Sequence, residues 1–155
     1  MEFTRVKYVA ADEGEMIENG PIRIRIVEHS DDTTHRIGIT EVHLEPDTLG
    51  PPQHYHLAHE ETFYVVSGLV RFTSAEESIE VGPGGLITAP LGAPHTFANP
   101  DHDESAIMLV TYTPDRYINY FRQMGELALN GKQISDEQDI EIMAGYETYP
   151  YPPVS

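Results

Sequence analysis

Residues 54–68 of this chain read HYHLAHEETFYVVSG, and residues 84–99 read GGLITAPLGAPHTFAN. Both stretches combine short apolar runs with glycine, and the second also contains two prolines. Glycine adopts positive φ and proline fixes its own φ, so these residues at this density mark tight reversals of the chain. We therefore predict a series of short strands joined by turns. The candidate metal ligands in these strands are His54, His56, Glu61 and His95.

The period of a β-strand predicts which of these side chains share a side. Side chains alternate between the two faces of a strand, so the first two histidines, two residues apart, point the same way. Glu61 shares a face with Phe63 in the next apolar run, and His95 shares a face with Phe97. Neighbouring strands can thus bring all four ligands to one interior. We expect Phe63 and Phe97 to line a substrate pocket beside them.

These two stretches resemble the two signature motifs of the cupin superfamily. The matching positions are His54, His56, Glu61 and Gly68 in the first motif, and Gly84, Pro90, Gly92, His95 and Asn99 in the second. Thr48 stands where the family usually has glycine, and we expect Gly50 and the prolines after it to shape this entry loop instead. The resemblance covers residues 36–113 and implies a double-stranded β-helix, the small jelly-roll barrel of the cupins.

The rest of the chain predicts one all-β domain with a helical extension. A chain of 155 residues supports a single hydrophobic core. Alternating or continuous apolar runs predict further strands at residues 22–27, 36–45, 69–74, 78–81 and 106–110. We assign residues 1–113 to the barrel and residues 114–155 to a C-terminal helical extension of the same domain.

The extension begins with a helix-start signal. Thr113 followed by Pro114 is typical of an N-cap with proline at the first helical position. Apolar side chains then recur at helical spacing, at Tyr117, Phe121, Met124 and Ala128. Ser135 and Gln138 form the pattern of a capping box, which predicts a second helix to about residue 144. The tyrosine-rich tail packs onto the barrel or a second subunit, or it forms a lid over the barrel mouth.

The candidate ligands indicate a divalent transition metal. Nitrogen and oxygen donors without sulfur suit Fe, Ni, Mn, Cu, Co or Zn, and the sequence does not choose among these ions. Four protein ligands on an octahedral ion leave two positions for water, substrate or dioxygen. A carboxylate among three imidazoles can also release the metal and accept a proton, so we assign Glu61 the role of catalytic base.

The run from residue 54 to residue 68 is similar to small single-domain cupins related to quercetin 2,3-dioxygenase. That resemblance implies a metal set of three histidines and one glutamate, with the glutamate as substrate base, on His54, His56, His95 and Glu61. It also implies a homodimer. The first hypothesis is therefore a metal-dependent dioxygenase, an oxidoreductase that acts on a small aromatic or polyphenolic, flavonol-like molecule together with O₂.

Two other classes of function stay open. One is a non-oxidative isomerase or lyase that acts on a small carbonyl compound. Phosphorylated substrates of such enzymes need cationic groups, and Arg71 is the arginine that we expect to point into the pocket. The other class is a barrel that binds a small molecule without catalysis, as a sensor or a store.

Composition excludes several kinds of partner. The formal charge of −17 repels nucleic acid and anionic membranes. The chain has no cysteine, so disulfides and thiolate metal sites are excluded, and a cytoplasmic location is expected. No stretch is apolar for long enough to cross a membrane. The remaining histidines are expected outside the site, and His59 in particular is expected to be solvated in the turn between the ligands.

Overall fold

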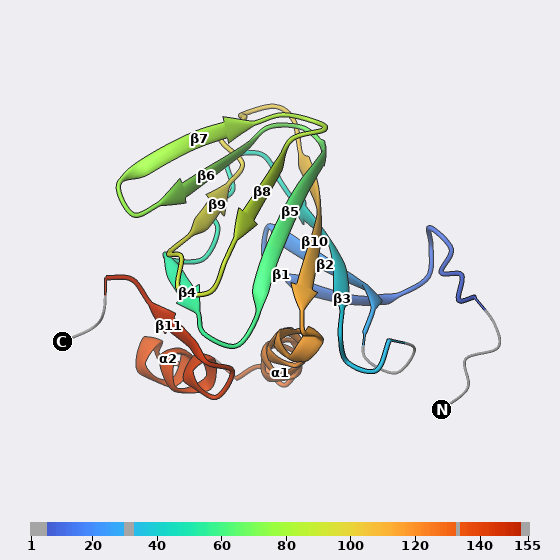
Figure 1. Ribbon diagram of the computed structural model, residues 1–155, viewed down its shortest axis with the longest axis vertical. Coiled ribbons are helices and arrows are strands. Elements are labelled where there is room, and N and C mark those ends of the chain that lie inside the picture. The colour runs from blue at the N-terminus through green and yellow to red at the C-terminus, as the bar shows by residue number, and fades with distance from the viewer. Residues whose placement is uncertain (1–5, 30–32, 133, 153–155) are drawn as a thin grey trace.

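The computed structural model describes residues 6–29, 33–132 and 134–152. A six-stranded sheet with the order β1-β2-β3-β10-β5-β8 and a three-stranded sheet with the order β7-β6-β9 make up the barrel (Figure 1). The larger sheet comprises β1 (Glu15–Asn19), β2 (Ile22–Glu28), β3 (Gly38–Leu44), β5 (Glu60–Ser67), β8 (Leu86–Ala89) and β10 (Ala106–Thr113). The smaller sheet comprises β6 (Val70–Ser74), β7 (Glu77–Val81) and β9 (Thr96–Ala98). A separate pair joins β4 (His54–His56) to β11 (Thr148–Pro150).

Alternation of side chains gives the central strands β3, β5 and β10 of the larger sheet one buried face. Every second residue of β10 is buried, and in β5 the buried residues are Glu61, Phe63 and Val65. Val70 and Phe72 of β6 meet this layer from the smaller sheet and belong to the same apolar core. The carboxylate of Glu61 therefore lies on the interior face of the barrel because it keeps the parity of its apolar neighbours.

The predicted all-β barrel with C-terminal helices is confirmed. Each predicted strand overlaps an observed one, with ends shifted by one or a few residues. Three observed strands were not predicted: β1, β8 and β11. The last of these has three residues, too few to show a period of two.

The C-terminal segment starts differently from the prediction. Thr113 is the last residue of β10, and the first helical turn is the 3₁₀ turn η1 (Asp115–Tyr117), which has no side-chain cap. The helix α1 (Ile118–Leu129) follows directly. The predicted N-cap at Thr113 is therefore wrong, because strand pairing with β5 extends through this residue.

The second predicted helix has the expected start. In α2 (Asp136–Ala144) the hydroxyl of Ser135 accepts from the backbone of Gln138, and the side chain of Gln138 accepts from the backbone of Ser135. Figure 1 shows α1 and α2 at the end of the barrel where β4 lies. None of the helices in the described part of the chain is long and apolar enough to cross a membrane.

The entry loop before β4 depends on Gly50. Its N–H donates to the carbonyl of Phe97 at 3.0 Å, and a Cβ on Gly50 would lie 2.1 Å from that same oxygen. Thr48, at the position where cupins usually have glycine, is buried, and its hydroxyl donates to the carbonyl of Glu45. Close approach of the loop to β9 thus requires glycine at position 50.

Candidate metal centre

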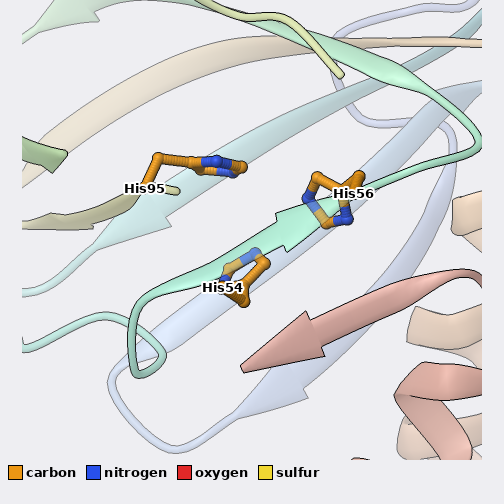
Figure 2. Close-up of side chains that lie close together, drawn as sticks. All are labelled: His54, His56 and His95. Atoms are coloured by element: carbon orange, nitrogen blue, oxygen red, sulfur yellow. The ribbon is translucent and has the colours of Figure 1, made fainter. Parts of the chain in front are cut away.

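Three imidazoles converge where β4 meets the start of β9. The backbones of His54 and His95 exchange two hydrogen bonds, N to O, of 3.1 and 2.9 Å. The loop before His95 is held to β4 by Gly92, whose N–H donates to the carbonyl of His56. The centroids of the three rings are 4.8 to 5.1 Å apart, and all three side chains are buried (Figure 2).

Each of these rings is anchored by its Nδ1 atom. The Nδ1 of His54 donates to the carbonyl of Pro52 at 2.9 Å, and that of His95 donates to the carbonyl of Ala93 at 3.0 Å. Since a neutral imidazole that donates from Nδ1 keeps its lone pair on Nε2, these contacts select the tautomer that binds a metal through Nε2.

The Nδ1 atom of His56 has a different anchor. It lies 2.8 Å from the hydroxyl oxygen of Thr148 in β11, and that hydroxyl points its own hydrogen at the carbonyl of Tyr146. The threonine oxygen is thus left to accept from His56. The C-terminal strand therefore fixes the third ring in the same tautomer as the other two.

Glu61 adds a carboxylate to the three rings. One oxygen, Oε2, accepts from Nε2 of His95 at 3.1 Å, and the other, Oε1, lies 3.4 Å from Nε2 of His56. Burial acts to raise the pKa of Glu61, but hydrogen bonds from the surrounding imidazoles hold this pKa well below its usual value. The carboxylate is therefore ionised at neutral pH, as both a metal ligand and a proton acceptor must be.

The prediction that His59 is solvated is wrong. Only 2% of His59 is exposed, and its Nε2 donates to Oε1 of Glu61 at 3.2 Å. Its ring stacks on Tyr117 from η1, with centroids 4.6 Å apart. The ring is buried because the C-terminal segment covers the turn, which the local sequence does not reveal.

The protonation of the histidines around Glu61 shows that the carboxylate attracts positive charge. His95 donates from both ring nitrogens, to Ala93 and to Glu61, which requires its protonated form. Burial alone lowers the pKa of His95, but the hydrogen bond to Glu61 outweighs this and raises it. Burial lowers the pKa of His54 to about 4, and the neighbouring imidazoles add to this effect. The proton on Nε2 of His95 thus supplies the positive charge beside the Glu61 carboxylate that a bound cation would otherwise supply.

One buried atom supports metal binding directly. The Nε2 of His56 is buried, and its contact with Oε1 of Glu61 at 3.4 Å lacks the geometry of a good hydrogen bond, so it has no well-formed partner in the described part of the chain. A buried polar atom without a partner carries a free-energy cost that a bound ion removes. Two groups in the described residues bring ligand atoms within 4.8 Å of one another: His54, His56 and His95, and His56, His59 and Glu61. These residues fit a divalent transition metal.

The residues expected to form a substrate pocket lie in different places. Phe63 is in the core, with its ring centroid 5.7 Å from that of His95 and 6.0 Å from that of Phe97. The prediction that Arg71 points inward is wrong, because its guanidinium donates to Glu80 on the exposed face of the β6–β7 hairpin. Val70 and Phe72 take the inner face, so alternation turns Arg71 outward.

A cavity of about 430 Å³ opens between the two sheets, and His95 is among the residues that line it. Phe63 and Phe97 are not among them. A second hollow of about 480 Å³ lies between α1 and α2 and has none of the candidate ligands in its lining. The cavity that reaches His95 is therefore the one that bears on the metal centre.

The comparisons agree with this fold. Residues 40–112 match the family model of the cupin domain. The match covers slightly less than half of the chain, and the fold agrees with that of solved structures such as the RmlC-like cupin from Shewanella frigidimarina, which is 16% identical with a TM-score of 0.62. No curated protein matches the sequence at a significant level.

Solved structures share the fold over most of the chain. KdgF from Halomonas sp. is 21% identical, with a TM-score of 0.61 over 70% of this chain and 94% of the other. The polyketide cyclase RemF from Streptomyces resistomycificus is 24% identical, with a TM-score of 0.62 over 70% and 80%. The nucleoside dehydratase Pac13 from Streptomyces is 24% identical, with a TM-score of 0.56 over 72% and 83%. At these identities the likeness shows the fold.

Proposed function

We propose that this cupin is a metal-dependent dioxygenase that acts on a small aromatic or polyphenolic molecule. The observation that carries the proposal is the buried group of His54, His56, His95 and Glu61, with a carboxylate held ionised between imidazoles. A divalent transition metal bound by these four residues would supply redox or Lewis-acid chemistry at this position.

The protein's own residues would prepare the substrate for oxidation. The Glu61 carboxylate accepts the proton of a substrate hydroxyl, which makes the aromatic ring electron-rich. His59 donates a hydrogen bond to Oε1 of Glu61, and this contact fixes the orientation of the carboxylate that acts as base. The ring of Phe63 lies against His95, and Phe72 packs against Phe63, so these apolar side chains keep bulk water from that side of His95.

Oxygen consumption tests this proposal. The metal-loaded protein is mixed with a panel of catechols and flavonols in an oxygen-electrode cell, and uptake is compared with that of Glu61→Gln. We expect uptake with at least one phenol and a loss of about 100-fold in the variant, the usual size of a general-base effect. Metal-loaded protein that consumes no oxygen with any phenol contradicts the proposal.

A non-oxidative reaction is the second candidate. Two of the structural neighbours are a polyketide cyclase and a nucleoside dehydratase. An ionised Glu61 can equally remove a proton next to a carbonyl group, with the metal or an imidazolium on the oxygen. Turnover of a carbonyl compound under strict exclusion of O₂ would favour this lyase or isomerase over the dioxygenase, and ligand binding without turnover would favour a non-catalytic barrel.

We also propose that the protein forms a homodimer and that it works in the cytoplasm. Tyr64 of β5 and Leu86 of β8 are neighbours on the outer face of the larger sheet, and both are exposed. Such an apolar pair supports a contact with a second copy. Light scattering tests the dimer: we expect twice the chain mass, and a shift toward one chain mass in Tyr64→Lys.

A further inference from the structure

The cavity beside His95 has walls from both sheets of the barrel. Phe72 of β6 and Ile79 of β7 are directly paired, and their side chains belong to the face that turns toward the interior. Ile87 and Ala89 of β8 line the cavity from the larger sheet, in which β8 pairs with β5, the strand that carries Glu61. Ala89 is the partner of Glu61 in that pairing. The cavity therefore has residues of β7 and β8 in its walls, and His95 is the one candidate ligand in its lining.

Polar groups in this cavity are mainly uncharged. Four of the lining residues carry hydroxyl groups: Thr73, Ser74, Ser78 and Thr88. Ser74 has the inward parity of Phe72, whereas Thr73 and Ser78 are hydrogen-bonded to each other on the outer face of the hairpin. Thr88 alternates with Ile87 and Ala89 along β8. No lysine or arginine is among the lining residues in the described part of the chain. A phosphate or carboxylate inside the cavity would therefore lack the cationic partner that such groups require when they leave water.

One carboxylate stands at the rim of the cavity. Glu77 begins β7 and lies opposite Ser74, with the same strand parity as Ile79, so its side chain belongs to the inward-facing side of the hairpin. The nearest arginine along the hairpin, Arg71, has the opposite parity and is paired with Glu80 outside. The charge of Glu77 thus adds to the negative field of a chain whose formal charge is −17.

We propose that this cavity is a substrate entrance that selects uncharged molecules, and that Glu77 is the residue that rejects anions. The inference rests on the proposed function and names the class of its substrate: a neutral, partly hydroxylated molecule with an apolar body. The hydroxyl of Ser74 contacts its polar edge, Phe72, Ile79 and Ile87 contact its apolar part, and His95 is the candidate ligand that the molecule reaches.

Two matched probes test this selection. Catechol is neutral, and catechol-3,5-disulfonate carries two added negative charges on the same chelating ring. Dissociation constants of both are measured by calorimetry under nitrogen, on protein loaded with the metal that it retains on purification. We expect wild-type protein to bind catechol at least about tenfold more tightly than the disulfonate. Glu77→Gln is expected to reduce this preference about threefold to tenfold, since it removes a like charge from the rim.

Glu80→Gln is the matched control. It removes the same charge from the same strand, but Glu80 lies on the outer face and is not part of the cavity lining. We expect it to leave the preference unchanged. Ile79→Trp, at an exposed lining residue, is expected to weaken catechol binding without changing the metal content. Equal effects of the two glutamate variants, or catechol binding that Ile79→Trp does not change, would overturn the proposal.

The experiments distinguish failure of the proposed entrance from failure of the proposed dioxygenase activity. Selective binding that depends on Glu77, with no oxygen uptake from any phenol, keeps the neutral-ligand entrance and removes the dioxygenase. Oxygen uptake with the same rate on neutral and sulfonated phenols, in both wild type and Glu77→Gln, keeps the dioxygenase and removes the entrance.

Discussion

His56 and Thr148 lie 92 residues apart in the sequence, and the Nδ1 of the histidine is 2.8 Å from the hydroxyl oxygen of the threonine. Both residues are buried, and they are directly paired between β4 and β11. The C-terminal strand is thus part of the metal centre, because it fixes the tautomer of one candidate ligand.

Removal of the Thr148 hydroxyl should weaken metal binding. Thr148→Val keeps the shape of the side chain and leaves Nδ1 of His56 without an acceptor, so we expect the metal affinity to fall by about tenfold to 100-fold. Competition with a chromophoric chelator measures this change. Thr148→Ser should restore most of the affinity, and a valine variant with wild-type affinity would show that the contact does not support the ligand.

The metal-free protein should lose stability in mild acid. The pKa of His54 is about 4 in the folded chain against 6.5 in its reference state. The folded state therefore binds fewer protons than the unfolded state between these pH values, and stability falls as the pH drops through this window. This group alone contributes about 3 kcal/mol. Glu61, with its lowered pKa, acts in the same direction at the acid end, whereas the raised pKa of His95 opposes the trend.

Urea unfolding of chelator-treated protein at about pH 7 and about pH 4.5 checks this expectation. A His54→Asn variant should show a smaller loss than the wild type. Equal stability of the wild type at the two pH values would contradict the assignment of His54 as a buried neutral imidazole.

His59 should contribute to stability through Glu61. His59→Phe keeps a ring against Tyr117 but removes the donor to Oε1, and loss of a buried hydrogen bond to a charged group costs about 1.5 to 3 kcal/mol. His102→Phe is the control, since His102 is exposed and its contact with Asp47 is on the surface. Denaturant unfolding should give a change below about 0.5 kcal/mol for that control, and similar losses for both variants would refute a special role for His59.

A methyl group at position 50 should destabilise the entry loop. In Gly50→Ala the new Cβ would meet the carbonyl oxygen of Phe97 at 2.1 Å, so the loop must move away from β9. We expect a loss of about 1 to 3 kcal/mol in thermal or denaturant unfolding. Gly82→Ala, where no atom lies within 4 Å of the new Cβ, should have little effect.

The motifs allowed the barrel and the convergence of His54, His56 and His95 to be predicted, because these residues lie on or beside short strands whose alternation can be read locally. The addition of Glu61 to these histidines as a fourth ligand stays a prediction. Arg71 was misplaced although the signal was present: Val70 and Phe72 on either side of it determine the inner face. His59 was misplaced for a different reason. Its burial requires Tyr117, and the anchor of His56 requires Thr148, so both depend on a C-terminal segment whose docking has no local pattern.

Metal content is the most direct test of the central claim that His54, His56, His95 and Glu61 form a metal centre. Protein purified without added metal or chelator is analysed for transition metals by mass spectrometry, beside His95→Ala whose fold is verified by circular dichroism. We expect about one Fe, Ni, Mn, Cu, Co or Zn ion for each wild-type chain, since imidazole and carboxylate donors suit these ions, and a loss of this ion in the variant. Wild-type protein that holds no metal and takes up none on reconstitution would contradict the account.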